Sequence, residues 1–196
     1  KRGVQLAVAH ERVKELCGDF QLIMLSATVS DPERVAEFFS GGKTTKVVNA
    51  DTDKKFEITV INPKPTTADD KIVGKIFSSK DTAARLRTIM DLIKSSRSTL
   101  TFTNTRDFAE ILASRIRVVD SKFPVAIHHG SLSKEVRIKA EKEFKEEKIK
   151  SLISTSSLQL GIDIGSVDQT IQYMSPRQVS QLVQRVGRSG HELSKV

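Results

Sequence analysis

The sequence predicts an α/β fold built on a parallel sheet, and two observations carry this prediction. From Thr99 onward, short apolar segments of strand length alternate with longer segments in which apolar residues recur every three or four positions. Strands that alternate with helices of this length form right-handed βαβ units, whose strands run parallel. Polar residues also follow the ends of several predicted strands, which is where ligands bind in such sheets.

The first 50 residues predict two helices and two short strands. Apolar residues at roughly helical spacing indicate an amphipathic helix over 4–16, and the apolar run at 22–25 has the length of a buried strand. Asp31 is a favoured helix N-cap and is followed directly by a proline, so a second helix begins there and ends near the glycines at 41–42. A further short strand is expected at 46–48.

Gly42-Lys43-Thr44 matches the end of a phosphate-binding P-loop, but the match fails elsewhere. A P-loop has glycine five positions before Gly42, where this sequence has Glu37. The P-loop also runs from a strand into a helix, and here the predicted order is reversed. We therefore interpret these residues as the end of a helix.

A polar, charged join at 51–55 is the predicted linker between residues 1–50 and a larger domain at 56–196. Alternating apolar and polar residues at 56–60 predict a half-exposed strand. The remaining predicted elements are a loop at 63–70, a helix over 82–94, a strand at 99–103, a helix over 106–118, a strand at 125–127, a helix capped by Ser133, strands at 151–155 and 167–173, and a last helix that begins at Pro176. The polar segments that follow the central strands are 104–106, 128–130 and 155–157.

Composition and charge narrow the class of partner. The formal net charge is +8, and residues 81–196 carry 19 Lys and Arg against 13 Asp and Glu. A basic surplus of this kind favours a polyanion such as nucleic acid. Cys17 is the only cysteine, which excludes an internal disulfide and a cysteine-rich metal site. No apolar run reaches membrane-spanning length, so we expect no membrane partner and a cytoplasmic protein.

The segment at 184–191 holds two arginines three residues apart, with one glycine between them and another after them. Glycine lets the backbone approach a phosphate closely, and the planar guanidinium of arginine matches phosphate geometry. This is the chemistry of an arginine finger, which neutralises charge on a transferring phosphoryl group. Taken alone, the segment is equally compatible with a solvated basic turn.

Five segments in this order resemble the second half of the motor of superfamily 2 helicases, and especially its large helicase-related branch. They are Ser26-Ala27-Thr28, residues 102–106 (Phe-Thr-Asn-Thr-Arg), 128–132 (His-His-Gly-Ser-Leu), 155–163 (Thr-Ser-Ser-Leu-Gln-Leu-Gly-Ile-Asp) and 184–191 (Gln-Arg-Val-Gly-Arg-Ser-Gly-His). The resemblance covers essentially the whole chain. It implies a RecA-like helicase domain 2 preceded by the C-terminal part of a RecA-like domain 1.

The resemblance also implies roles for individual residues. Ser26, Ala27 and Thr28 match the motif that couples ATP hydrolysis to strand movement between the motor domains. Gln184 is similar to the γ-phosphate sensor and Arg188 to the arginine finger, with Arg185 supporting them or bridging to the partner domain. The residues implied to contact the nucleic acid are Thr105, Arg106, His129, Gly130, Thr155 and Ser156. Those implied to contact nucleotide are Gly161, Asp163, Gln184, Arg188 and His191.

Two departures from the family pattern qualify these roles. Many relatives have arginine at the position of His191. Histidine contacts a phosphate more weakly than arginine near neutral pH, because its imidazole is neutral or only partly charged. The sequence also contains no P-loop and no acidic Mg²⁺-binding box, which the family places before the Ser-Ala-Thr motif. We expect ATP and Mg²⁺ to be bound mainly by the remainder of domain 1 in a longer parent chain, and this fragment by itself not to hydrolyse ATP.

The resemblance implies an ATP-dependent helicase that acts on single-stranded or partly duplex DNA with 3′-to-5′ polarity, RNA being the other candidate strand. A non-catalytic nucleic-acid-binding module with the same fold is the alternative, and Gln184 and Arg188 distinguish the two. An unrelated small-molecule domain would leave five ordered motifs as coincidence. His128 and His129 suggest a metal pair, but no carboxylate or cysteine lies nearby in the sequence, so we expect loop histidines and no metal site.

Overall fold

The computed structural model describes residues 2–26, 29, 31–49, 57–159 and 164–189, and the chain divides into two compact units. Unit 1 comprises Lys1–Lys55 and unit 2 comprises Phe56–Val196.

Unit 1 contains the two predicted helices, α1 (Arg2–Cys17) and α2 (Pro32–Ser40). The Asp31 side chain accepts a hydrogen bond from Arg34 N at 3.0 Å, and Gly41 ends α2 in the left-handed region at φ 62°. Lys43 Nζ lies 3.0 Å from Asp19 Oδ1. The Gly-Lys-Thr segment therefore follows a helix C-cap, as predicted, and its lysine pairs with a carboxylate.

Within the described part of unit 1, the strands predicted at 22–25 and 46–48 do not form, and those two predictions are wrong. A strand is stabilised by hydrogen bonds to a neighbouring strand, and none of the described residues supplies one here. Leu25 is accordingly 93% exposed. Apolar composition indicated a buried strand, but burial depends on a partner that a local pattern does not specify.

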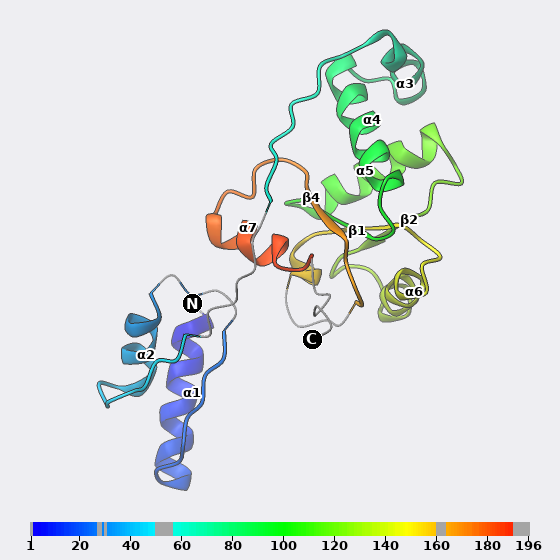
Figure 1. Ribbon diagram of the computed structural model, residues 1–196. Coiled ribbons are helices and arrows are strands. Elements are labelled where there is room, and N and C mark those ends of the chain that lie inside the picture. Colours follow the sequence, from blue (N-terminus) through cyan, green and yellow to red (C-terminus); the bar gives the residue numbers. More distant parts are fainter. Residues whose placement is uncertain (1, 27–28, 30, 50–56, 160–163, 190–196) are drawn as a thin grey trace, which may run out of the picture. The chain divides into compact units, whose positions relative to one another are not determined.

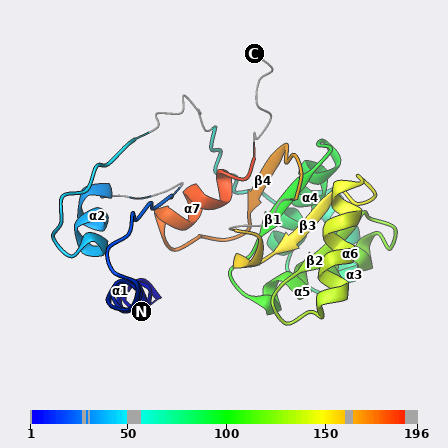
Figure 2. The ribbon, with the colours of Figure 1, turned by 90° about the horizontal axis from the view of Figure 1, so that it is seen from below.

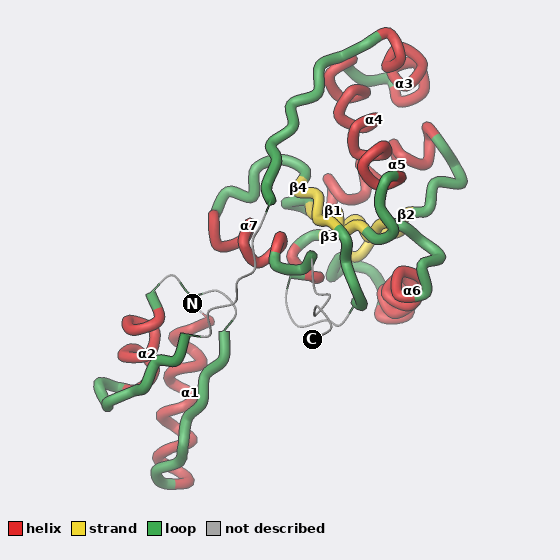
Figure 3. Tube along the Cα trace, in the orientation of Figure 1, coloured by secondary structure: helices red, strands yellow, loops and turns green. Residues whose placement is uncertain are grey.

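Unit 2 begins with an extended segment at 57–66, which Figure 3 draws as loop. The predicted strand at 56–60 is wrong for its described residues, since the segment pairs with no strand of the sheet and Val60 is 93% exposed. A 3₁₀ turn, η1 (Thr67–Asp69), leads into α3 (Asp70–Ile76) and α4 (Lys80–Lys94).

The four strands of unit 2 form one parallel sheet in the order β2-β3-β1-β4 (Figure 2). They are β1 (Thr99–Phe102), β2 (Val125–His128), β3 (Ser151–Ser154) and β4 (Gln169–Gln172). Leu100 of β1 lies opposite Leu152 of β3 on one side and Thr170 of β4 on the other. The predicted parallel α/β sheet is confirmed, with all four strands where the sequence places them.

Helices cover both faces of this sheet (Figure 1). On one face, α4 and α5 (Arg106–Val119) pack Leu86, Ile93 and Ile116 around Ile153 of β3. On the other face, α6 (Lys134–Lys145) packs Phe144 against Leu100, Phe102 and Leu152. The alternating side chains Leu152 and Ile153 of β3 thus serve two cores, which fixes the register of this strand.

The last helix, α7 (Val179–Val186), starts three residues later than predicted. Pro176 was expected to open it, but the next residue, Arg177, has φ 66°. A left-handed residue cannot belong to a right-handed helix. The helix therefore begins only after this turn. None of the helices in the described ranges is long and apolar enough to cross a bilayer.

Asp69 provides a test of what stabilises the start of unit 2. Its side chain is 0% exposed and accepts hydrogen bonds from Arg87 Nε at 2.7 Å and Thr66 N at 2.7 Å. The hydrogen bond from Arg87 is the main cause that holds the pKa of Asp69 below its usual range. We expect Asp69→Asn to lower the melting temperature by several degrees at pH 7, because it weakens the contact between the buried carboxylate and the half-buried Arg87 guanidinium.

The pH dependence of this effect follows from the lowered pKa. The contribution of Asp69 is complete above the unfolded pKa of about 4 and is lost as pH falls through the lower folded value. The gap between wild type and Asp69→Asn should therefore narrow below about pH 4. Asp70→Asn is the matched control, since its ion pair with Lys80 is exposed and worth little. Equal losses in the two variants would contradict this account.

Candidate functional site

The carboxyl ends of all four strands meet at one edge of the sheet, here called the rim. Because β3 lies between β1 and β2, the loops that follow these three strands are neighbours. The predicted polar segments at 104–106, 128–130 and 155–157 are these loops. Their proximity was expected from the parallel sheet alone.

The loop after β1 presents Arg106 to solvent. Thr105 is the N-cap of α5, and its Oγ1 accepts a hydrogen bond from Phe108 N at 3.3 Å. This capping uses one acceptor lone pair of the hydroxyl that was predicted to contact nucleic acid, and the O–H group can still donate to a phosphate. Arg106 itself is exposed, and its Nη1 donates to Ser131 Oγ in the loop after β2. Ser131 was not singled out from the sequence, although it lies in the segment at 128–132.

His128 and His129 are buried at the end of β2, and each contacts a carboxylate. His128 Nε2 lies 2.7 Å from Glu141 Oε1, and its Nδ1 lies 2.8 Å from Ser157 Oγ. His129 Nε2 lies 2.8 Å from Glu110 Oε1. Gly130 next to them is exposed.

The expectation of two loop histidines with no carboxylate nearby is therefore not met, since His128 ends β2 and each histidine contacts a carboxylate. The carboxylates lie on α5 and α6, 19 and 13 residues away, and inspection of the neighbouring sequence missed them. The helices that return over the sheet bring them in. Among the described residues, no three His, Cys, Asp or Glu side chains gather as a metal site.

The loop after β3 runs from the rim toward α7. Thr155 is half-buried and Ser156 is exposed. Ser156–Leu158 form the 3₁₀ turn η2, which Gln159 closes by donating its N–H to Ser156 O at 3.1 Å. Leu158 is buried in the same core as Phe102 and Phe144, so the turn is anchored on the α6 face of the sheet.

Gln159 joins this loop to two residues that were predicted to contact nucleotide. Its Nε2 donates to Gln184 Oε1 of α7, and its carbonyl oxygen accepts from Arg188 Nε at 3.1 Å. Arg188 is half-buried, and burial lowers the pKa of its guanidinium without removing its charge at neutral pH. The structure thus brings Gln184 and Arg188 together beside the loop that carries Thr155 and Ser156.

Arg185 is buried beneath them and is 3% exposed. One guanidinium nitrogen donates to Gln172 Oε1 at 2.6 Å and to Asn104 Oδ1 at 3.4 Å, and its carbon lies 5.3 Å from the Phe102 ring centre. Burial lowers the pKa of Arg185. Because Gln172 ends β4 and Asn104 lies just after β1, this arginine fastens two rim segments to α7.

Gly187 ends α7 where a side chain would not fit. A Cβ at this position would lie 3.0 Å from the carbonyl oxygen of Val183. The sequence suggested that glycine gives a ligand access to the backbone. In the structure it also allows the close turn that carries the chain from Arg185 to Arg188.

Several predicted site residues lie outside the described ranges, namely Ala27, Thr28, Gly161, Asp163 and His191. Ser26 is described and exposed, in the loop between α1 and α2 of unit 1.

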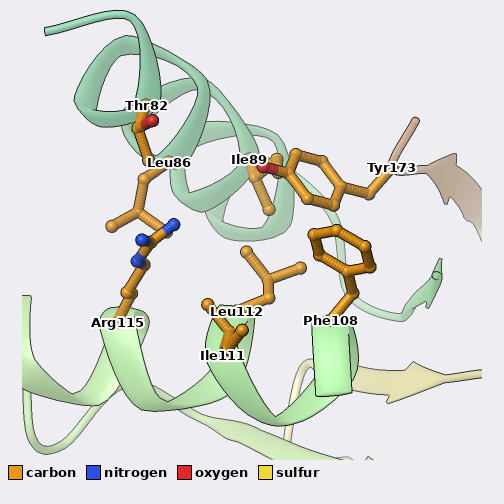
Figure 4. A pocket seen from close by; sticks show the side chains of 8 residues that line it. All are labelled: Thr82, Leu86, Ile89, Phe108, Ile111, Leu112, Arg115 and Tyr173. Atoms are coloured by element: carbon orange, nitrogen blue, oxygen red, sulfur yellow. The ribbon is translucent and has the colours of Figure 1, made fainter. Parts of the chain in front are cut away.

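A small apolar pocket opens between α4 and α5, away from these polar groups. Figure 4 shows Phe108 and Tyr173 facing each other at one end and Arg115 reaching toward Leu86 at the other. Its walls are otherwise aliphatic, with Ile89, Ile111 and Leu112 among the lining residues. The pocket offers few groups that could bind phosphate, so the candidate site remains at the rim.

Fold and rim together define a parallel α/β domain whose strand ends carry hydroxyls, arginines and amides suited to phosphate. The chain belongs to the helicases, since the model of the helicase conserved C-terminal domain matches residues 83–192. The predicted similarity to the large helicase-related branch of superfamily 2, and the RecA-like fold it implied, are confirmed by the relatives below.

The chain is 38% identical to the ATP-dependent helicase Lhr-Core of Methanothermobacter thermautotrophicus, over 98% of this chain and 23% of that protein. It is 40% identical to the ATP-dependent helicase Lhr-Core of Methanocaldococcus jannaschii, over 98% of this chain and 22% of that protein. The solved structure of Mycobacterium smegmatis helicase Lhr bound to ssDNA and AMP-PNP matches with a TM-score of 0.84 and 35% identity, over 99% of this chain and 25% of that one. The chain thus spans about a quarter of the length of these relatives.

Arg185→Ala tests whether this arginine stabilises the rim. Its loss leaves the side-chain oxygens of Gln172 and Asn104 without their donor in a buried setting, which typically costs about 1–3 kcal/mol. We expect a fall of that size in the free energy of unfolding, measured by urea denaturation of the 196-residue chain. Arg117→Ala, an exposed arginine of α5, is the control and should change little. Equal stability of both variants would show that Arg185 does not fasten the rim.

Proposed function

We propose that this chain is the part of an ATP-dependent helicase that supplies the groove for the nucleic-acid strand and the arginine finger for hydrolysis. The observation that carries the proposal is the cluster in which Gln159 contacts both Gln184 and Arg188, one turn away from Thr155 and Ser156. The loop after β3 carries groups suited to a strand phosphate, and through Gln159 it contacts the groups suited to a nucleotide. The activity of the whole protein is part of this proposal.

The strand contacts are assigned to the exposed edge of the rim. Arg106 and Ser131 form one contact between neighbouring loops, and Ser156 lies after the strand between them. Further backbone amides and hydroxyls come from Gly130, Thr155 and Ser156. His129 stabilises the loop after β2 through its contact with Glu110. Such groups hold phosphates without reading bases, as a translocating motor requires. DNA as the strand and 3′-to-5′ movement follow from the similarity to Lhr helicases.

The nucleotide contacts are assigned to α7 and the turn after it. When bound, ATP supplies the γ-phosphoryl group to be transferred to water. The Arg188 guanidinium and the Gln184 amide fit such a group, because both can donate hydrogen bonds to phosphate oxygens. The described residues supply no carboxylate cluster for Mg²⁺. We therefore assign the metal, the P-loop and most of the ATP contacts to the remainder of domain 1.

Ser26, Ala27 and Thr28 are assigned to coupling between the two motor domains. An arginine supplied by one domain completes a nucleotide site on another only when the domains close. ATP hydrolysis then depends on the distance between the two motor domains, and a change in that distance moves the nucleic-acid strand. Gly161, Asp163 and His191 keep the nucleotide roles that the family resemblance implies.

Arg188→Ala tests the finger in the full-length helicase. Loss of an arginine finger typically costs about 10³–10⁵ in rate. We expect ATP hydrolysis stimulated by nucleic acid to fall accordingly, while binding of a fluorescent ATP analogue changes little because most contacts lie elsewhere. Turnover at the wild-type rate would refute the helicase proposal and favour the non-catalytic binding module.

Arg106→Ala tests the strand groove. Removing one phosphate contact from a single-stranded complex should weaken binding and reduce the slope of log K against log salt by about 0.7. Fluorescence anisotropy with a labelled oligonucleotide over a salt series measures both quantities. Arg117→Ala, at the far end of the same helix, removes the same charge and is expected to leave the slope unchanged. An unchanged slope for Arg106→Ala would exclude this residue from the groove.

A further inference from the structure

We infer that Gln159 is a positioning residue that holds Gln184 and Arg188 in the geometry needed for hydrolysis. The inference rests on the proposed function, and it assigns a role to a residue that the motif comparison passed over. Gln159 lies between the segment that would contact the strand and the helix that would contact the nucleotide.

The contacts of Gln159 are unusual for a loop glutamine. The residue is 8% exposed, although it lies in a polar segment at the rim. Its side-chain amide donates to Gln184 Oε1, its carbonyl accepts from Arg188 Nε, and its N–H closes η2. A buried amide costs free energy unless it is hydrogen-bonded, so the bond to Gln184 holds the side chain, and the two main-chain bonds hold the backbone that carries it.

The contact with Gln184 has a chemical consequence. A carboxamide has one acceptor end and one donor end. With Oε1 engaged by Gln159, the amino group is the end of Gln184 that carries donors, and a phosphate oxygen accepts from donors. The bond to Arg188 acts similarly, because it fixes Nε and orients the rest of the guanidinium.

The position of Gln159 also limits how far the strand-contacting residue Ser156 can move independently of Gln184 and Arg188. Ser156 and Gln159 are joined by a single 3₁₀ turn, which rises only about 2 Å per residue. Leu158 anchors that turn in the core. A displacement of the strand-contacting end is therefore passed to Gln184 and Arg188 through Gln159.

The test uses the full-length helicase with Gln159→Leu, which keeps the volume and removes the amide. We expect kcat for DNA-stimulated ATP hydrolysis to fall by about 10–100-fold, the loss typical of reacting groups misplaced by about 1 Å. The KM for ATP and the affinity for single-stranded DNA should change little, because the contacting groups remain. Wild-type kcat in this variant would overturn the inference.

Two further variants separate positioning from a structural defect. Gln169→Leu removes a half-buried glutamine of β4 that bonds Leu92 O and Ser96 Oγ, and it should lower the melting temperature similarly without affecting kcat. Gln159→Glu keeps the size and polarity of the side chain, but a carboxylate only accepts, so the Gln184 amino group has to turn toward it. It should therefore lose kcat as Gln159→Leu does, and wild-type kcat in Gln159→Glu would contradict the link.

The double variant Gln159→Leu/Gln184→Ala completes the design. Because Gln159→Leu removes the side-chain bond to Gln184 and keeps the carbonyl that accepts from Arg188, the double variant should be little slower than Gln184→Ala alone. Additive losses would contradict the inference. Normal turnover in Arg188→Ala would instead refute the proposed function, whereas a slow Arg188→Ala with a normal Gln159→Leu would refute only the role of Gln159.

Discussion

The candidate site depends on the position of β3 in the middle of the sheet. The loops after β1 and β2 lie on either side of it, so Arg106 and Ser131 meet across the rim. The loop after β3 then reaches α7, because Gln159 in this loop donates a hydrogen bond to Gln184 of that helix. A different strand order would separate these groups, because the loops after β1 and β2 meet across only the single strand that lies between them.

Arg185 shows what this arrangement costs and what it provides. A guanidinium that is 3% exposed loses most of its hydration, and among the described residues the Arg185 guanidinium contacts amide oxygens and an aromatic ring. A buried charge held in this way contributes less stability than a well-packed apolar side chain would. In return, one guanidinium nitrogen joins Asn104 after β1 and Gln172 of β4 to α7, and this fixes the position of the helix that carries Gln184 and leads to Arg188.

The sequence predicted those elements of unit 2 that are determined locally. Apolar patterns predicted the strands at 99–103 and 125–127, and capping predicted the helix that begins after Ser133. Tertiary contacts in the folded domain stabilise the same elements. The strands expected at 22–25 and 56–60 failed because pairing depends on a partner elsewhere. Pro176 misled for a related reason, since the left-handed φ of Arg177 is set by the turn and not by the identity of its residues. Motifs placed Gln184 and Arg188 in the site, but side-chain partners such as Glu141, Ser131 and Gln159 emerge only when distant segments fold together.

The distinction between Arg185 and Arg188 illustrates how a motif can conceal two different tasks. The two arginines are three residues apart and look equivalent in the sequence. In the structure, the helix directs Arg185 inward over Phe102, whereas the turn at Gly187 releases Arg188 to the edge near Gln159. Substitution of Arg185 should therefore reduce stability, and substitution of Arg188 should reduce rate with less effect on stability. A motor needs both, because a finger accelerates a reaction only if the helix that carries it does not move when charge develops on the phosphate.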